Sequence, residues 1–357
     1  MRRTWEIVLL CLLVFVTAAP PSSAAVTATT RGRAIVVANR PFFPIMQWSQ
    51  CPNDFGSSLL LGIDVFMGSC EDVPPDVAAA LLGRHGYVVP PIEVRGWLRG
   101  ARVLGWHQPD EPENLGLPAN ALAAPRRARG LTFLTLTSEF MQRARGPSAY
   151  GAYVARADVV GFDLYPIAAH CKTHISLADV YLGQRDLLAL APGKPTYQWI
   201  ETGPLDGRCT SREPVTPEEV RAEVWLAIAG GATGIGYFTH TWTRGMWFRF
   251  DVSFLMSAVI EQTNREIRAL APALLSTQLE ASATEPVYAG ARAYGDTVFV
   301  IAVNASAAPV AAEIRVPADV QLRTADRWGG EGGVEFTDGA IRDTFGPLEP
   351  RVYILRR

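Results

Sequence analysis

The stretch "ADVVGFDLYP" (residues 157–166) is an apolar run that ends in charged and aromatic side chains. Its apolar residues are continuous and do not alternate with polar ones, which is typical of a parallel β-strand buried on both faces. The polar end carries Asp163 and Tyr165. The stretch therefore predicts one strand of a helix-covered parallel sheet, with functional side chains where the strand ends.

Runs of the same kind recur along the first 240 residues, and helix-like stretches separate several of them. The further strand candidates are residues 33–38, 59–67, 86–91, 101–107, 131–137, 195–201 and 231–240. The helix candidates are residues 76–84, 117–129, 147–155, 176–190, 216–231 and 254–270. In the clearest helix, Thr216 is the cap and Pro217 the first helical residue. Eight strands with intervening helices predict an α/β fold, a (β/α)8 TIM barrel.

The pattern changes after residue 272. Apolar and polar residues then alternate, with turn signals between the runs, which is typical of antiparallel strands. We therefore expect a (β/α)8 catalytic barrel over residues 26–272 and a small C-terminal antiparallel β-sandwich over residues 276–357.

The first 25 residues have the features of a signal peptide. Arg2 and Arg3 precede an apolar stretch over residues 7–19, and Ser22 and Ala24 stand at the small-residue positions before a cleavage site. The apolar stretch is short for a membrane span. The sequence predicts a secreted protein, extracellular or periplasmic, with an uncleaved anchor as the alternative.

Four cysteines remain after removal of the signal peptide, and an even number in an exported protein suggests two disulfides. Three pairings are possible. We favour Cys51–Cys70 and Cys171–Cys209, because the members of each pair are neighbours in sequence. A zinc site is the competing interpretation, although no CxxC spacing occurs.

Composition and motifs exclude several classes of function. The formal net charge of −2 in 357 residues does not suggest nucleic acid or an anionic membrane as a partner. No glycine-rich dinucleotide or phosphate motif follows a strand, and no GxSxG occurs. We expect a monomer without cofactor or metal that acts on a carbohydrate.

Carboxylates follow two of the predicted strands. Glu111 lies in "DEP" (residues 110–112) after the fourth strand, and Glu201 ends the seventh. Catalytic side chains of such barrels lie at the carboxyl ends of the strands, so these two can meet across the mouth. Glycoside hydrolysis with retention requires an acid and a nucleophilic carboxylate about 5–5.5 Å apart.

"DEP" and "IETG" (residues 200–203) resemble the retaining glycoside hydrolases of the large (β/α)8 clan with catalytic Glu at strands four and seven. The resemblance covers residues 33–270 and implies Glu111 as acid/base and Glu201 as nucleophile. The clan usually has Asn where Asp110 stands. Asp can accept but not donate the hydrogen bond of that amide, and when ionised it should raise the pKa of Glu111.

Further side chains near the strand ends are candidates for substrate binding. The resemblance implies that Tyr165 contacts the nucleophile, and Trp242 could form a stacking floor for a sugar. Each candidate also has a structural alternative as a packed ring or a hydrogen-bonded core residue. Besides Asp110, the candidates are Tyr165, Asp163, Trp242, His240, His107, Gln47 and Trp48.

Three functions remain open from the sequence. The first is an exported retaining glycoside hydrolase that cleaves O-glycosidic bonds of an oligo- or polysaccharide. The second is a non-catalytic carbohydrate-binding barrel. The third is a metal-dependent hydrolase using Asp110, Glu111, Asp163 and a His, but the usual HxH or HExxH spacing is missing.

Overall fold

The computed structural model describes residues 28–70, 73–96, 102–125, 130–141, 149–170, 173–205, 209, 215–243, 246–316, 322–330 and 334–356. The predicted signal peptide and Cys171 lie outside these residues.

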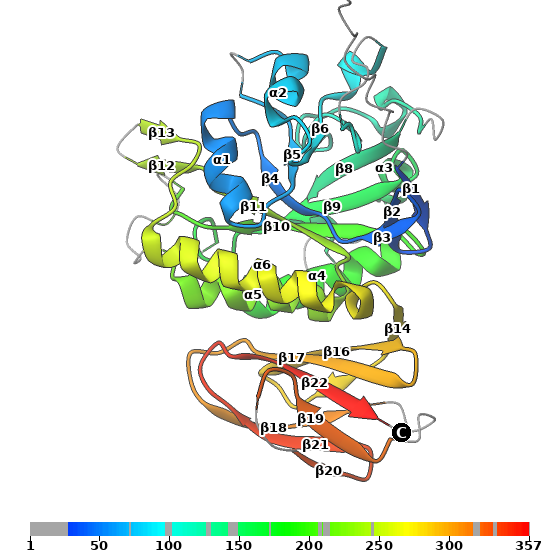
Figure 1. The fold of residues 1–357 in the computed structure, drawn as a ribbon, viewed down its shortest axis with the longest axis vertical. Helices are drawn as coiled ribbons and strands as arrows, with labels where there is room; N and C mark the ends of the chain where they lie inside the picture. The colour runs from blue at the N-terminus through cyan, green and yellow to red at the C-terminus, as the bar shows by residue number, and fades with distance from the viewer. Residues whose placement is uncertain are drawn as a thin grey trace, which may run out of the picture.

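Eight parallel strands form a barrel (Figure 1). They are β4 (Ile45–Trp48), β5 (Val65–Met67), β6 (Tyr87–Val89), β7 (Gly105–His107), β8 (Leu131–Thr137), β9 (Val159–Asp163), β10 (Thr196–Glu201) and β11 (Gly234–Phe238). Each strand pairs with the next along the chain except β6 and β7, and β11 pairs with β4. Two isolated parallel bridges, Val88–Val103 and Pro91–His107, close the ring between β6 and β7. The predicted (β/α)8 fold is thereby confirmed.

The assignment of residues 33–38 as the first barrel strand is wrong. β2 (Ala34–Val37) instead pairs antiparallel with β1 (Ala28–Arg31) and β3 (Arg40–Phe42), and the first barrel strand is β4. β2 is buried along its whole length, and its Ile35 packs against side chains of the barrel interior. An apolar run that covers one end of a barrel thus has the same sequence pattern as a barrel strand.

The helices differ in length around the barrel. They are α1 (Pro52–Leu60), α2 (Pro75–Leu82), α3 (Gly151–Val154), α4 (Leu177–Leu190), α5 (Pro217–Gly230) and α6 (Phe254–Leu274), with the 3-10 turns η1 (Ile92–Gly96), η2 (Ala119–Ala121) and η4 (Ser138–Phe140). The predicted helix over residues 117–129 is wrong, because its described part holds only η2. The strand over residues 59–67 is shorter than predicted, because Leu59 and Leu60 end α1, which the sequence analysis missed.

The long helices α4 and α5 begin with capping boxes. Thr216 accepts from the backbone N–H of Glu219, and Glu219 accepts in return from the backbone N–H of Thr216 at 2.9 Å. Ser176 and Asp179 make the same arrangement at the start of α4. These reciprocal bonds satisfy N–H groups that a helix start leaves unpaired, so the predicted cap at Thr216 is confirmed.

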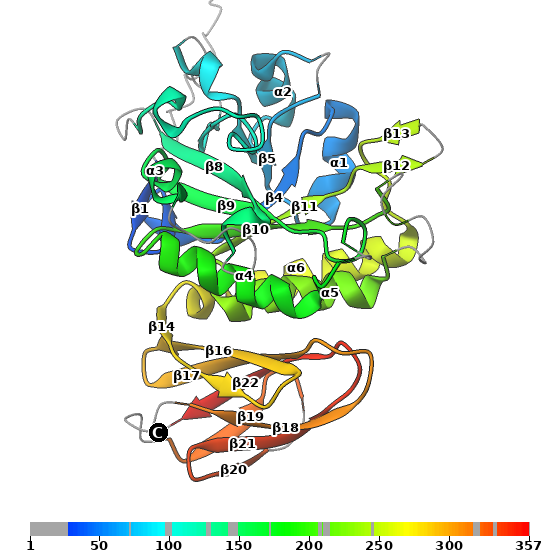
Figure 2. The same ribbon diagram turned by 180° about the vertical axis from the view of Figure 1, so that it is seen from behind.

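The C-terminal strands form two antiparallel sheets below the helices (Figures 1 and 2). One sheet has the order β14 (Thr277–Leu279), β16 (Val287–Tyr294), β17 (Thr297–Asn304), β22 (Pro350–Arg356) and β19 (Thr324–Arg327). The other has the order β15 (Ser282–Ala283), β18 (Val310–Arg315), β21 (Ala340–Phe345) and β20 (Glu335–Thr337). Their facing side chains enclose a separate apolar core, which confirms the predicted β-sandwich.

The sandwich packs directly on the helix layer of the barrel. Figure 2 shows α4, α5 and α6 between the barrel strands and the sheet that contains β16 and β17. Arg292 of β16 is fully buried there and donates to the carbonyls of Ile228 at 2.9 Å and Leu274 at 3.3 Å. These carbonyls belong to the last turns of α5 and α6, where a cation is favourable. The junction is therefore a specific interface.

A disulfide joins Cys51 and Cys70, as predicted, with the two Cα atoms 5.0 Å apart. Cys209 is also disulfide-bonded; because Cys171 is not described, the pairing Cys171–Cys209 stays a prediction. Among the described helices, none has the length and apolar character needed to cross a membrane.

Replacing Gly290 with Ala should weaken the junction. A Cβ atom at Gly290 would lie 2.0 Å from the carbonyl oxygen of Ala229, so the sheet must move away from α5. We expect a loss of about 1–3 kcal/mol in unfolding free energy, measured by urea denaturation. Gly56→Ala is the matched control, because nothing lies within 4 Å of its Cβ position; it should gain about 0.4–1 kcal/mol. Equal stability of Gly290→Ala and wild type would contradict the tight junction.

Candidate active site

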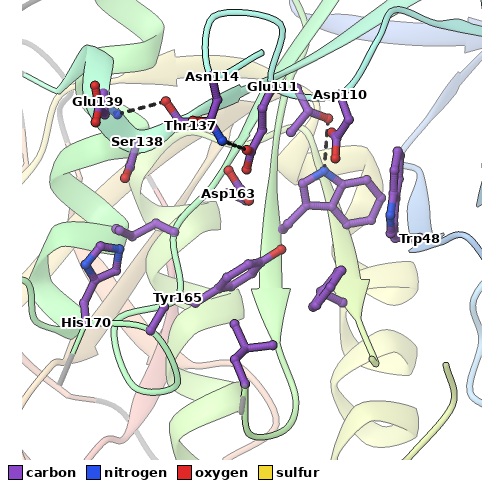
Figure 3. Close-up of a pocket in the computed structure, with 16 residues that line it drawn as sticks. Trp48, Asp110, Glu111, Asn114, Thr137, Ser138, Glu139, Asp163, Tyr165 and His170 are labelled. Atoms are coloured by element: carbon purple, nitrogen blue, oxygen red, sulfur yellow. Dashed lines mark hydrogen bonds between the residues drawn. The ribbon is translucent and has the colours of Figure 1, made fainter. Parts of the chain in front are cut away.

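A pocket of about 570 Å³ opens at the carboxyl ends of the barrel strands (Figure 3). Its lining combines carboxyl groups, aromatic rings and hydroxyl groups. The lining residues are Trp48, Asp110, Glu111, Asn114, Thr135, Thr137, Ser138, Glu139, Asp163, Leu164, Tyr165, Ala169, His170, Trp199, Leu205 and Phe238. Of the residues predicted from the sequence, the pocket brings together Glu111, Asp110, Asp163, Tyr165 and Trp48.

Glu111 is held in an unusual backbone conformation. Its φ is +43°, in the left-handed region that non-glycine residues rarely adopt. Its carbonyl accepts from the N–H of Asn114 at 2.9 Å and of Leu115 at 3.2 Å, and its Oε2 accepts from Asn114 Nδ2 at 2.8 Å. This tight turn directly after β7 aims the carboxyl group into the pocket. Strained residues of this kind are concentrated at functional sites.

The carboxyl groups of Glu111 and Asp163 lie near each other in the pocket and interact electrostatically (Figure 3). Burial, and then the charges of Glu111 and Asp110, raise the pKa of Asp163 well above its ordinary value. This environment therefore favours the protonated form of Asp163.

Asp110 borders the same pair from the strand side. It is exposed to the pocket yet surrounded by protein in the concave wall, and this burial together with the charges of Glu111 and Glu113 raises its pKa to about 7. Thr135 hydrogen-bonds to the Asp110 carboxylate. The Thr135 hydroxyl also receives a hydrogen bond from Trp199 Nε1 at 3.2 Å, so Asp110 is tied to the barrel interior.

Glu113, two residues after Glu111, is half-buried. Its Oε1 accepts from the backbone N–H of Thr137 at 2.6 Å and from the Thr137 hydroxyl at 3.0 Å. Glu113 thereby links the loop after β7 to the end of β8. Its position in the sequence, next to other acidic residues, gave no signal of this partner 24 residues away.

Aromatic rings form the opposite wall of the pocket. Tyr165 stacks on Phe238 with ring centroids 5.3 Å apart and an interplanar angle of 27°. Trp48 lies edge-on to Trp199 at 5.7 Å. Trp199 is 2 % exposed and packs inside the barrel, while its ring also borders the pocket. Such surfaces suit the apolar faces of sugar rings.

Glu201 lies outside this set of lining residues. It is 1 % exposed, and its two carboxylate oxygens accept from the backbone N–H groups of Ile167 at 2.7 Å and Ala168 at 2.6 Å. Burial raises its pKa to about 7, although these two hydrogen bonds act in the opposite direction. The side chain of Glu223, from α5, hydrogen-bonds to it as well. Glu111 and Glu201 therefore do not share the described pocket.

Three other candidates have hydrogen-bond partners within the barrel wall and are not among the described lining residues. His240 is 2 % exposed and hydrogen-bonds to the Trp48 carbonyl at 3.1 Å, and burial lowers its pKa to about 4. His107 bonds through Nδ1 to the Gln108 carbonyl at 2.8 Å. Gln47 donates to Thr239 at 2.9 Å. The side chain of Trp242 is outside the described part of the chain, so its role as a sugar floor stays a prediction.

Several lining residues escaped the sequence analysis. Asn114 and Thr135 are examples: Asn114 acts on Glu111 within the same turn, Thr135 acts on Asp110 from the neighbouring strand, and neither has a motif of its own. Glu139 and His170 stand two and seven residues beyond the ends of β8 and β9, which was the only signal available. Within the described residues, no three His, Cys, Asp or Glu side chains are grouped so that they could hold a metal ion.

Comparison with known proteins supports the fold. No protein-family model matches the chain, and no curated protein matches it. A glycoside hydrolase family 5 structure from Bacteroides vulgatus is similar with a TM-score of 0.57 and 12 % identity, covering 94 % of each chain. A glycoside hydrolase family 30 endoxylanase from Clostridium papyrosolvens has a TM-score of 0.53 and 11 % identity, covering 88 % of this chain and 97 % of that one. AmyP in complex with maltose has a TM-score of 0.54 and 10 % identity, covering 85 % and 88 %.

These similarities place the chain among barrels with the fold of glycoside hydrolases. The predicted resemblance is confirmed at the level of the fold, and no particular family is resolved.

The raised pKa values predict how stability depends on pH. A carboxyl group whose pKa is higher in the folded state stabilises the fold at low pH, and this contribution is lost as pH rises through the folded pKa. The groups concerned are Asp110, Asp163, Glu201 and Glu223. His107 and His240 are buried and have lowered pKa values, so they change the unfolding free energy mainly below pH 6.5. We therefore expect the unfolding free energy to fall from pH 6.5 to pH 8.5, measured by urea denaturation.

The variant Glu223→Gln is the control for this pH dependence. It removes one titrating group from the interior, so the decrease over the same range should become smaller. A wild-type unfolding free energy that rises between pH 6.5 and 8.5 would show that these carboxyl groups are not protonated in the fold.

Proposed function

We propose that the protein is a glycoside hydrolase that cleaves O-glycosidic bonds, with Glu111 as the general acid/base. The observation that supports this most is the carboxyl pair of Glu111 and Asp163 in a pocket with aromatic walls, at the carboxyl end of a glycoside hydrolase-like barrel. Barrels of this fold carry their reactive groups at this end.

We propose Asp163 as the second catalytic carboxylate. Inverting hydrolysis requires carboxyl groups about 6.5–9.5 Å apart, so that a water molecule fits between them, whereas retention requires about 5–5.5 Å. Glu111 and Asp163 line the same pocket and interact directly with each other, which favours the shorter separation. This geometry supports retention. Glu201 as nucleophile stays the alternative from the sequence resemblance.

The proposed reaction proceeds in two steps. The proton that burial favours on Asp163 passes to Glu111 and from Glu111 to the leaving-group oxygen, while the ionised Asp163 attacks the anomeric carbon, so the glycosidic bond breaks and an ester bond forms. Glu111, now ionised, deprotonates a water molecule, which displaces Asp163 from the sugar and regenerates both groups.

Tyr165, in the aromatic wall, can act as a hydrogen-bond donor in this reaction. Burial and the neighbouring carboxyl groups, Asp163 first, raise the pKa of Tyr165 well above its ordinary value. Its hydroxyl therefore stays protonated and can donate a hydrogen bond to a carboxylate or a sugar oxygen.

We also propose that the protein is exported through the N-terminal signal peptide. The Cys51–Cys70 disulfide agrees with this proposal.

The first test is hydrolysis of a panel of aryl glycosides and polysaccharides by wild type and Glu111→Gln. We expect Glu111→Gln to lose roughly 10²–10⁴-fold in kcat/KM on substrates with poor leaving groups. The loss should be much smaller with dinitrophenyl glycosides, since their leaving group needs no protonation. Glu218→Gln, an exposed change in the first turn of α5, is the control.

Two outcomes would contradict the proposal. Wild type without activity on any glycan, but with glycan binding that survives Glu111→Gln, would indicate a binding barrel. Full activity of Asp163→Asn would remove Asp163 from the mechanism, because Asn has the same shape but cannot attack the sugar.

A further inference from the structure

The turn after β9 supplies one wall of the pocket. Tyr165, Ala169 and His170 line the cavity, and the carbonyl of Tyr165 accepts from the N–H of Ala169 at 3.0 Å. Between them, Ile167 and Ala168 are each 3 % exposed, and their side chains pack into the core beneath the helices. The same short turn thus presents one side to the pocket and the other to the core.

Glu201 holds this turn from behind. Each of its carboxylate oxygens takes one of the two consecutive N–H groups in the middle of the turn, at 2.7 and 2.6 Å. Both donors lie 33 or 34 residues before Glu201 in sequence, so the contact joins the end of β10 to the connection after β9. Two short charge-assisted bonds to consecutive amides fix both the position and the orientation of a turn.

Glu223, on α5, contacts the Glu201 carboxylate from the side opposite the turn. Glu223 is fully buried in α5, and neither of its oxygens accepts a well-formed hydrogen bond from a described N–H or O–H group. Its hydrogen bond is with the Glu201 carboxylate, which requires a proton on one of the two groups. Glu219 adds a further negative charge nearby. Burial and the charge of Glu201 raise the pKa of Glu223 well above its ordinary value, which favours Glu223 as the donor.

We infer that Glu201 is a positioning residue, which together with Glu223 holds the Tyr165–His170 wall in place for the carboxyl pair in the pocket. This inference rests on the proposed glycoside hydrolase function. To attack a sugar, Glu201 would have to release both N–H groups and leave them unpaired in the core, which is unfavourable. Asp163 needs no such rearrangement, because it already lines the pocket.

Rescue by azide distinguishes the two carboxylates. Azide can enter the space left by a deleted nucleophile, attack the anomeric carbon and displace the aryl leaving group, which yields a glycosyl azide. We expect Asp163→Ala to lose on the order of 10⁴-fold or more in kcat on aryl glycosides and to regain turnover with azide. Glu201→Ala should form no glycosyl azide at any azide concentration.

The other variants test positioning. Glu201→Gln keeps one acceptor oxygen and leaves one turn N–H unpaired, so we expect a loss of about 10²-fold in kcat/KM through displacement of the wall, with part of it in KM. Glu223→Gln keeps a donor toward Glu201 and should stay close to wild type. Glu223→Met has a similar size without a donor, and its kinetics should resemble those of Glu201→Gln.

Formation of glycosyl azide by Glu201→Ala, and none by Asp163→Ala, would overturn the inference and establish Glu201 as nucleophile. Hydrogen exchange of the Ile167 and Ala168 amides gives a readout that does not depend on activity. These amides should be protected in wild type and exchange faster in Glu201→Gln; unchanged protection would also overturn the inference. If wild type hydrolyses no glycoside, the proposed function fails, while exchange still tests the contact.

Discussion

Two interacting carboxyl groups inside a protein disfavour each other's ionised form, and the carboxyl end of this barrel contains two such pairs. Glu111 and Asp163 interact in the pocket, and Glu201 and Glu223 interact behind its wall, and in each pair one pKa is raised well above its ordinary value. In each pair a neighbouring acid, Asp110 or Glu219, adds repulsion. The turn from Tyr165 to His170 lies between the two pairs. The geometry of the Glu111–Asp163 pair therefore depends on where Glu201 and Glu223 hold the backbone of this turn.

The barrel is built unevenly around this arrangement. The connections after β4 to β8 contain short helices and 3-10 turns, and their residues form the open side of the pocket. The connections after β9 and β10 contain the full-length helices α4 and α5, and α6 follows β11. Glu223 lies on α5, which the sandwich covers from the other side. The short side therefore carries Glu111, and the long side carries the wall turn and the helix that packs behind it.

Periodicity and caps were sufficient to predict the barrel, the sandwich and the limits of the long helices, because those features are local. The first strand was misassigned because burial, not pairing, determines an apolar pattern, and β2 is as buried as a barrel strand. The part of the site that lies at strand ends, including Asp110, Glu111 and Asp163, could be predicted from the sequence. The direction in which Glu201 points could not be predicted, since it depends on amides more than thirty residues away.

The helix α5 has consequences for the way this chain could be divided. Eleven of its fourteen residues are buried, and they face the strands on one side and the sandwich on the other. A helix that is apolar all round has no surface suited to water. The change in sequence pattern near residue 272 thus marks where the barrel ends and the sandwich begins. It does not mark a barrel that would be soluble without the sandwich. Transplanting the barrel alone into another protein would require a new polar surface on α5 or a substitute for the sandwich.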